Sequence, residues 1–181
     1  MDTIGRLFET AWQARGKGRY DLAQANLSEA IDISRRSGDE MALARALTSK
    51  GQIERDCGRI GAAVPLYEEA VRLYRQASDP LALASALRHL GDLHQEREDY
   101  YDAEPFYEEA LAIYRAVDGT PSLALANALR PLALLREAQG EFDIALPIWR
   151  EALVLYHEAG VEAGVDECKT HIDALRPGAE E

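Results

Sequence analysis

One short stretch decides the fold of this chain because it occurs three times: MALARAL at residues 41–47, LALASAL at residues 81–87 and LALANAL at residues 123–129. The copies start 40 and 42 residues apart. A second motif keeps the same spacing, as AVPLYEEA at residues 63–70, AEPFYEEA at residues 103–110 and ALPIWREA at residues 145–152. A fixed period of this size predicts an architecture of stacked repeats rather than one globular core.

The composition indicates a folded, acidic protein. The chain has 181 residues, of which 47% are hydrophobic, and a formal net charge of −12 at pH 7. Nucleic acids and anionic membranes attract positive surfaces, so this charge argues against both as partners. No apolar run approaches the roughly 20 residues that cross a bilayer, and no secretory signal begins the chain. Two isolated cysteines, Cys57 and Cys168, make no disulfide framework, so we expect a cytoplasmic protein.

Each repeat contains two stripes of apolar or small residues at helical spacing, which in the third repeat are Leu83, Leu87, Leu90, Gly91 and His94, followed by Ala103, Tyr107, Ala110 and Tyr114. The sequence therefore predicts two helices per repeat. Asp39, Asp79 and Thr120 each precede a first helix, where we expect their side-chain oxygens to cap free N–H groups. Glycines at the turn between the two helices suit the left-handed residue that ends a helix, and they are Gly18, Gly58 and Gly140. The third repeat has Glu98 at this position.

The repeats also share small residues where helices are expected to cross closely: Gly51, Gly91 and Ala133. We expect the large residues Tyr67, Tyr107 and Trp149 to fill the space beside them. The pattern predicts one domain over residues 1–176, with repeats at about 1–38, 39–78, 79–119 and 120–160. A capping helix is expected at 162–175, because Val165, Cys168 and Ile172 form one more apolar stripe. Residues 177–181 are expected to be disordered.

These residues resemble a known repeat family. Leu87, Leu90 and Gly91 on the first helix, with Tyr107 and Ala110 on the second, resemble the tetratricopeptide repeat (TPR) over roughly residues 4–158. The 40- and 42-residue spacing looks most like the kinesin-light-chain subtype. The resemblance implies an all-α fold, a right-handed α-solenoid of antiparallel helix pairs with four repeats and a C-terminal cap. It also implies that the first helices line a concave face that binds peptides or partner proteins, without catalysis.

First-helix residues that lie off the buried stripe are expected to face this groove. The predicted partner contacts among them are Arg45, Gln52, Arg55, Arg88, Asp92, Gln95, Asn127 and Arg130. Guanidinium groups at such positions hold the carbonyls or carboxylates of an extended peptide. The alternative is that the arginines are solvated and pair with Asp92, Glu96 or Glu137.

The aromatic residues of the first repeat also admit two interpretations. We expect Phe8 and Trp12 to pack on the second helix at the end of the stack, and the alternative is an apolar patch at the N-terminal end of the groove. The Lys and Asn clamp of chaperone-binding TPR proteins is replaced at its positions by Phe8, Trp12, Gln52, Ser85 and His89. Binding of a chaperone tail is therefore not expected.

No constellation of residues indicates catalysis, a cofactor or a metal. His89 and His94 are five residues apart and do not share a helical face. Cys168 and His171 have helical spacing but lack two further ligands. The sequence thus predicts a non-catalytic scaffold that binds a protein or peptide. The alternatives are a structural module that forms homodimers, a regulatory TPR subunit of a larger signalling system, and an enzyme or metal protein that uses the histidines.

Overall fold

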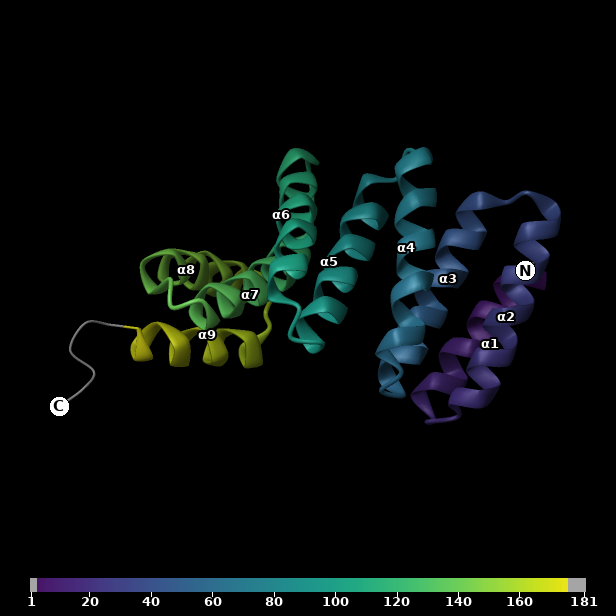
Figure 1. Ribbon diagram of the computed structural model, residues 1–181, viewed down its shortest axis with the longest axis horizontal. Coiled ribbons are helices and arrows are strands. Elements are labelled where there is room, and N and C mark those ends of the chain that lie inside the picture. Colours follow the sequence, from purple (N-terminus) through teal and green to yellow (C-terminus); the bar gives the residue numbers. More distant parts are fainter. Residues whose placement is uncertain (1–2, 176–181) are drawn as a thin grey trace.

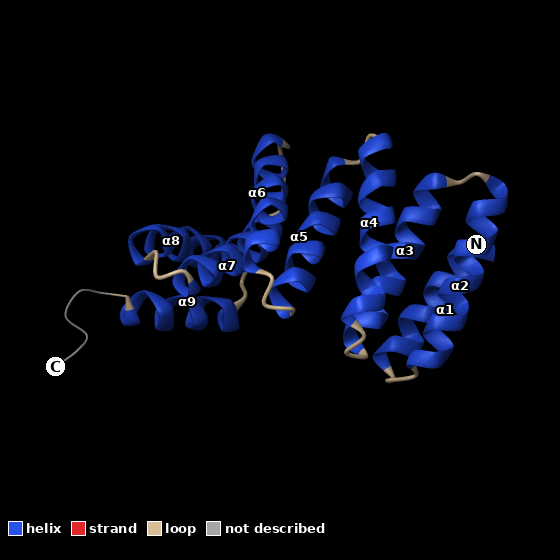
Figure 2. Cartoon of the chain, in the orientation of Figure 1, coloured by secondary structure: helices blue, strands red, loops and turns tan. Residues whose placement is uncertain are grey.

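A computed structural model describes residues 3–175 of the chain. Within this range the protein consists of nine α-helices and no strands (Figure 2). The helices are α1 (Thr3–Gly16), α2 (Tyr20–Ser37), α3 (Glu40–Asp56), α4 (Ile60–Gln76), α5 (Pro80–Glu96), α6 (Tyr100–Ala116), α7 (Ser122–Ala138), α8 (Phe142–Glu158) and α9 (Glu162–Ala174). The predicted all-α solenoid is confirmed. The tail at 177–181 lies outside the described residues.

Helices that follow one another run antiparallel, and the pairs stack side by side along the long axis of the molecule (Figure 1). The helix direction turns along the stack, so that α7 and α8 lie across the direction of α3 to α6 in this view. The cap expected at the C-terminal end is present as α9, which buries Val165, Cys168 and Ile172. The molecule is therefore an elongated, twisted stack without a single central core.

The small residues Gly51 and Gly91, which we call the small-residue seam, let an aromatic ring pack directly against a helix backbone in successive repeats. Tyr67 and Tyr107 are 1% and 0% exposed. A Cβ atom added to Gly51 would lie 2.6 Å from Tyr67 Cε2, and one added to Gly91 would lie 2.7 Å from Tyr107 Cε1. No carbon atoms approach so closely, so only glycine fits beside these rings. The predicted packing of large residues against small ones is confirmed.

The predicted helix boundaries are confirmed at two of the three caps. Asp39 Oδ1 accepts a hydrogen bond from Ala42 N at 2.9 Å, and Asp79 Oδ1 accepts one from Ala82 N at 3.0 Å. The prediction for Thr120 is wrong, since its Oγ1 donates to Val117 O at 2.8 Å and Pro121 precedes the helix. The connection before α7 spans residues 117–121, whereas the one before α5 spans only 77–79. The extra length carries Thr120 away from the capping position.

The turns between paired helices have the predicted backbone. Gly18, Gly58 and Gly140 have φ of 68°, 73° and 77°. Glu98 has φ 63°, and it is the one residue other than glycine with a positive φ in the described range. The third repeat therefore makes the same left-handed turn at a steric cost, because a β-carbon disfavours this conformation.

A ladder of ion pairs joins successive second helices on the outer side of the stack, and no single-repeat pattern predicts it. The pairs are Arg35 with Glu69 at 2.9 Å, Arg75 with Glu109 at 2.7 Å and Arg115 with Glu151 at 2.8 Å. Each pair is largely exposed, so we expect it to contribute only about 0–1 kcal/mol to stability.

Candidate binding groove

A groove of about 970 Å³ lies at the N-terminal half of the stack. Most of its walls come from α1, α3 and α5, the first helices of three repeats. Two of the predicted contacts, Arg45 and Gln52, line it. The short turns and the small-residue seam fix how these helices lie side by side, so the fold itself forms the groove.

The aromatic side chains of α1 line this groove. Phe8 also packs against a core cluster that includes Ala23 and Leu27 of α2, as expected, whereas the same expectation for Trp12 is wrong. Trp12 is 69% exposed, and Phe8 is half-buried. Both belong to the groove wall. The Arg15 guanidinium carbon lies 5.9 Å from the centre of the Trp12 ring, and most of the side chain is open to solvent. An exposed ring of this size on a groove wall is a typical feature of binding surfaces.

Arg45 is the exposed cation of the groove. Its guanidinium carbon lies 5.1 Å from the centre of the Phe8 ring, which is the geometry of a cation–π contact. Within residues 3–175 it forms no ion pair with a carboxylate. Arg15, which also lines the groove, has its charge balanced by Asp56 at 2.6 Å. Arg45 is therefore a cation that a negatively charged ligand meets without displacing a protein carboxylate.

The other six predicted contacts gather in a second hollow of about 380 Å³ between α3, α5 and α7, and they are Arg55, Arg88, Asp92, Gln95, Asn127 and Arg130. The two hollows adjoin where His89, in the first, lies beside Arg88, in the second. Arg88 Nη2 is 2.8 Å from His89 Nε2. The two hollows therefore meet at α5.

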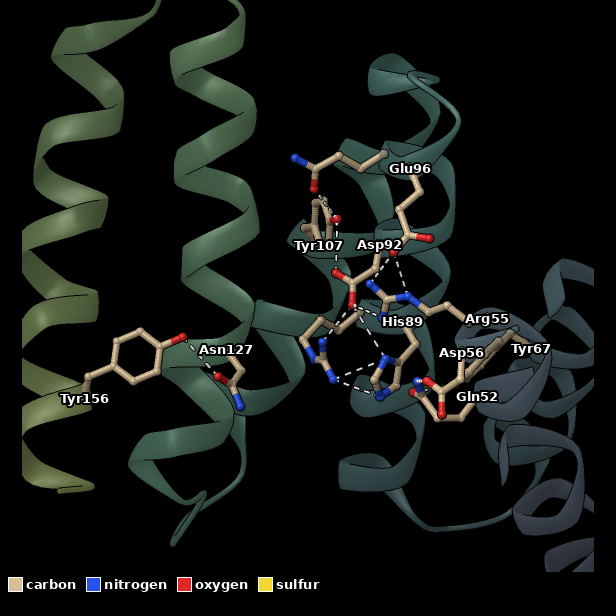
Figure 3. Close-up of polar contacts among 12 residues, drawn as sticks. Gln52, Arg55, Asp56, Tyr67, His89, Asp92, Glu96, Tyr107, Asn127 and Tyr156 are labelled. Carbon is tan, nitrogen blue, oxygen red and sulfur yellow. Dashed lines mark hydrogen bonds and ion pairs between the residues drawn. The ribbon is translucent and has the colours of Figure 1, made fainter. Parts of the chain in front are cut away.

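Asp92 is the centre of a hydrogen-bond network in the second hollow (Figure 3). Its carboxylate accepts from Arg88 Nη1 at 2.8 Å, from Arg55 Nη1 at 3.2 Å and from the Tyr107 hydroxyl at 3.2 Å. Burial by itself would raise the pKa of Asp92, but the neighbouring His89 ring and the charges of Arg88 and Arg55 lower it. Arg55 also contacts Glu96. Arg55 and Arg88 therefore pair within the protein, as the alternative interpretation proposed.

Arg130 is paired as well, with a residue that the sequence pattern does not indicate. Its Nε and Nη2 atoms donate to the two carboxylate oxygens of Glu167 on α9, at 2.7 and 2.6 Å. Arg88, the equivalent residue in α5, has Asp92 four positions later, whereas Arg130 has Leu134 there. Without an acceptor on its own helix, Arg130 pairs with the cap helix.

Tyrosine hydroxyl groups hold the amide side chains of the groove. The Tyr107 hydroxyl shares its one proton between Gln95 Oε1 at 2.7 Å and Asp92 Oδ1 at 3.2 Å, and the Tyr156 hydroxyl donates to Asn127 Oδ1 at 3.0 Å (Figure 3). Burial raises the pKa of Tyr107, mainly by disfavouring the phenolate, so the hydroxyl stays protonated as a donor. With their oxygens engaged, the amides present N–H groups to the hollow, and such groups bind carbonyl oxygens.

Three of the histidines, His89, His94 and His171, are in contact with aromatic rings. His94 stacks on Phe106 with ring centres 5.3 Å apart, and His171 stacks on Trp149 at 4.3 Å. Burial lowers the pKa of His89. In the part of the chain that the structure describes, no group of three or more His, Cys, Asp or Glu side chains is placed to bind a metal ion. No helix in that part is long and apolar enough to span a membrane.

A family model for the MalT-like TPR region matches residues 7–175. The chain belongs to this family. TPR repeats of this kind generally act as protein-interaction scaffolds, and no catalytic family is indicated. A search of curated proteins found no match.

Several solved structures share the fold of this TPR chain at low sequence identity. The apo form of RapI superposes with a TM-score of 0.89 at 13% identity, covering 98% of this chain and 64% of RapI. A putative kinesin light chain from Podosopora anserina, with nearly identical TPR-like repeats, gives 0.70 at 15% identity, covering 95% and 94%. A signal transduction ATPase with a tetratricopeptide repeat sensor, from Pyrococcus horikoshii, gives 0.82 at 16% identity, covering 97% and 28%. The chain therefore spans less than two thirds of RapI and less than a third of the ATPase.

Proposed function

We propose that this TPR protein is a non-catalytic scaffold that binds an extended peptide of a partner protein in its concave groove. The observation that supports the proposal is the groove of about 970 Å³, whose wall combines exposed Trp12 with unpaired Arg45. A peptide that lies along α1, α3 and α5 would bury apolar side chains on the aromatic rings and place an acidic group at Arg45.

The second hollow has a different role in this proposal. Its arginines already have carboxylate partners, so a ligand carboxylate would have to replace Asp92, Glu96 or Glu167 there. The amide groups of Gln95 and Asn127 instead suit the uncharged carbonyl groups of a peptide backbone. We therefore assign side-chain recognition to the first hollow and main-chain contacts to the second.

The test compares an arginine in the groove with one outside it. Partners captured from the source cells are identified, and the affinity of a peptide from the captured region is measured by calorimetry. Arg45→Glu is expected to weaken binding at least about tenfold, because a hydrogen bond between charged groups contributes about 1.5–3 kcal/mol. Arg72→Glu is the matched control, since Arg72 is exposed on α4 and does not line the groove. Equal affinity of wild type and Arg45→Glu would contradict the groove assignment.

Reversing the charge of Arg88 or Arg130 by substitution with glutamate would be a poorer test. Each has a carboxylate partner on this chain, so a glutamate there would face Asp92 or Glu167 and reduce stability as well as binding. Arg45 has no such partner among the described residues, so its variant separates binding from folding.

A regulatory role within a larger signalling system is the second candidate. It is favoured by the superposition on part of a signal transduction ATPase that carries a TPR sensor. The kinesin-light-chain subtype is likewise a proposal, supported by the repeat spacing and by the superposition on the putative kinesin light chain.

A further inference from the structure

The turns that join the two helices of each repeat carry charges that change sign along the stack. These turn segments are residues 15–21, 55–61, 95–101 and 137–143, and their formal net charges are +2, +1, −2 and −3. Because the paired helices are antiparallel and the pairs lie side by side, the four turns follow one edge of the stack. The turns of the first three repeats lie along the lower edge in Figure 1. This edge, which we call the turn edge, has a basic half in the first two repeats and an acidic half in the last two.

Charges on both halves of the turn edge are open to solvent. Lys17 and Arg19 in the first turn are exposed, and so are Glu98 in the third turn and Asp143 just after the fourth. Within residues 3–175 none of these four side chains forms an ion pair, although other charges of the same turns do. A surface of opposite charge therefore meets each half without breaking an ion pair that the protein already has.

Aromatic side chains accompany the charges on both halves. A hollow of about 330 Å³ lies on the basic half, and its walls are Trp12, Arg15, Gly16, Tyr20 and Asp56. The charges of Arg15 and Asp56 balance each other at 2.6 Å, which leaves the rings of Trp12 and Tyr20 as walls suited to an uncharged group. On the acidic half, Phe142 begins α8 and is 53% exposed. The basic half thus has an aromatic recess, and the acidic half has an exposed ring.

A second copy of this chain carries the matching charges in the matching order. When two copies lie antiparallel along the turn edge, the first turn of each faces the fourth turn of the other, and the second faces the third. Every turn then meets one of opposite charge, whereas a parallel arrangement would bring like charges together. The same contact forms twice about a two-fold axis, so the assembly closes at two copies. At physiological ionic strength the Debye length is about 8 Å, so these contacts outweigh the overall charge of −12 on each copy.

We propose that the turn edge is the interface of an antiparallel homodimer. The basic half of each copy binds the acidic half of the other, so that Lys17 and Arg19 lie against acidic turns. Phe142 of each copy enters the recess between Trp12 and Tyr20 of the other. Burial of these rings adds an apolar contribution to the attraction between the charges. The dimer does not depend on peptide binding in the groove.

Sedimentation velocity of the full-length chain, at protein concentrations up to about 1 mM, tests this proposal. We expect a reversible equilibrium of monomer and dimer without larger species. The dissociation constant is expected to rise about tenfold between about 0.15 M and 0.5 M salt, because salt screens the paired charges.

Charge reversal on each half gives the sharper test. Lys17→Glu combined with Arg19→Glu makes both halves acidic, and Glu98→Lys combined with Asp143→Lys makes both halves basic. Each double variant is expected to dimerise at least about tenfold more weakly than the wild type, because like charges face each other. An equimolar mixture of the two double variants is expected to form dimers again, because every half then meets its opposite.

Arg36→Glu combined with Arg150→Glu is the matched control. It adds the same negative charge as the first double variant, at exposed residues near the end of α2 and in the middle of α8, away from the turn edge. We expect it to dimerise like the wild type. A wild type that is monomeric at every concentration would overturn the proposal, and so would oligomers larger than the dimer. A mixture of the two charge-reversed variants that stays monomeric would also overturn it.

Discussion

Equivalent residues in different repeats have different partners, and the partners decide their roles. The positions of Gln52, Asp92 and Leu134 match in sequence. Gln52 donates a hydrogen bond to Asp56, and Asp92 accepts hydrogen bonds from Arg55 and Arg88. Leu134 has no acceptor to offer, so Arg130 pairs with Glu167 on α9 instead. The repeat pattern placed all three on the concave face but carried no information on their contacts. A repeat fixes position, whereas the partner of a polar side chain depends on the residues that the neighbouring repeats supply.

At the same scale, the ring packed on Gly91 makes a sharp test of the seam. We expect Gly91→Ala to lower the free energy of unfolding by about 1–3 kcal/mol, because the new Cβ would lie 2.7 Å from a buried Tyr107 ring that has no space to move. Urea unfolding followed by circular dichroism measures the change.

Gly61→Ala is the control for this substitution. Gly61 also lies within a helix, near the start of α4, but a Cβ there would meet nothing within 4 Å. Alanine is the better helix former, so this variant is expected to be neutral or more stable by up to about 1 kcal/mol. Equal stability of the two variants would show that the seam is looser than the structure indicates.

The helices are set by local signals, and the exceptions have local causes. Pro65, Pro105 and Pro147 each lie inside a second helix without ending it. Each is the sixth residue of its helix, so its missing N–H removes one backbone hydrogen bond, and the helix continues beyond it. Thr120 shows the opposite case, in which a good capping residue fails to cap because the preceding connection is longer.

The two aspartate caps yield a prediction at the scale of the element. Asp79→Ala is expected to cost about 1 kcal/mol of stability, because it leaves the N–H of Ala82 without its acceptor at the start of α5. Thermal unfolding measures the loss. Asp118→Ala serves as the comparison, since Asp118 is exposed in the connection before α7 and caps no helix, and a cost as large as that of Asp79→Ala would argue against capping as the cause.

The whole molecule is stabilised between neighbours rather than around one centre. A buried aromatic residue recurs on the second helices, as Tyr74, Tyr114 and Tyr156 at one position and as Tyr67, Tyr107 and Trp149 at another. Burial is the main cause that raises the pKa of each of these tyrosines. It also raises the pKa of Cys168 to about 11. Buried tyrosine hydroxyl groups, and the Cys168 thiol at the last junction, therefore lose their protons less readily in the folded protein than in the unfolded chain.

Stability should accordingly fall in alkaline solution. A group whose pKa is higher in the folded protein contributes fully below its unfolded pKa, which is about 8.5 for cysteine and about 10 for tyrosine. Above these values the unfolded chain ionises first, so the free energy of unfolding declines as the pH rises. Urea unfolding between pH 8 and about pH 11 measures the decline. We expect Tyr107→Phe to make this decline in the free energy of unfolding shallower. Tyr101 is 88% exposed, so we expect Tyr101→Phe to leave the decline unchanged. A free energy of unfolding that stays constant over this pH range would contradict the role assigned to the buried tyrosines.

The sequence by itself determined the helices, their pairing into repeats, the ring-on-glycine seam and the presence of a cap. These features follow from residue spacing within one helix or from a motif repeated every 40 or 42 residues, both of which are properties of the chain alone. The tertiary structure decided which cations of the groove are free. Arg55 and Arg130 find their carboxylates 37 residues further along the chain, on the next first helix of the stack. Such contacts depend on how far each repeat turns on the one before, and no local pattern encodes that rotation.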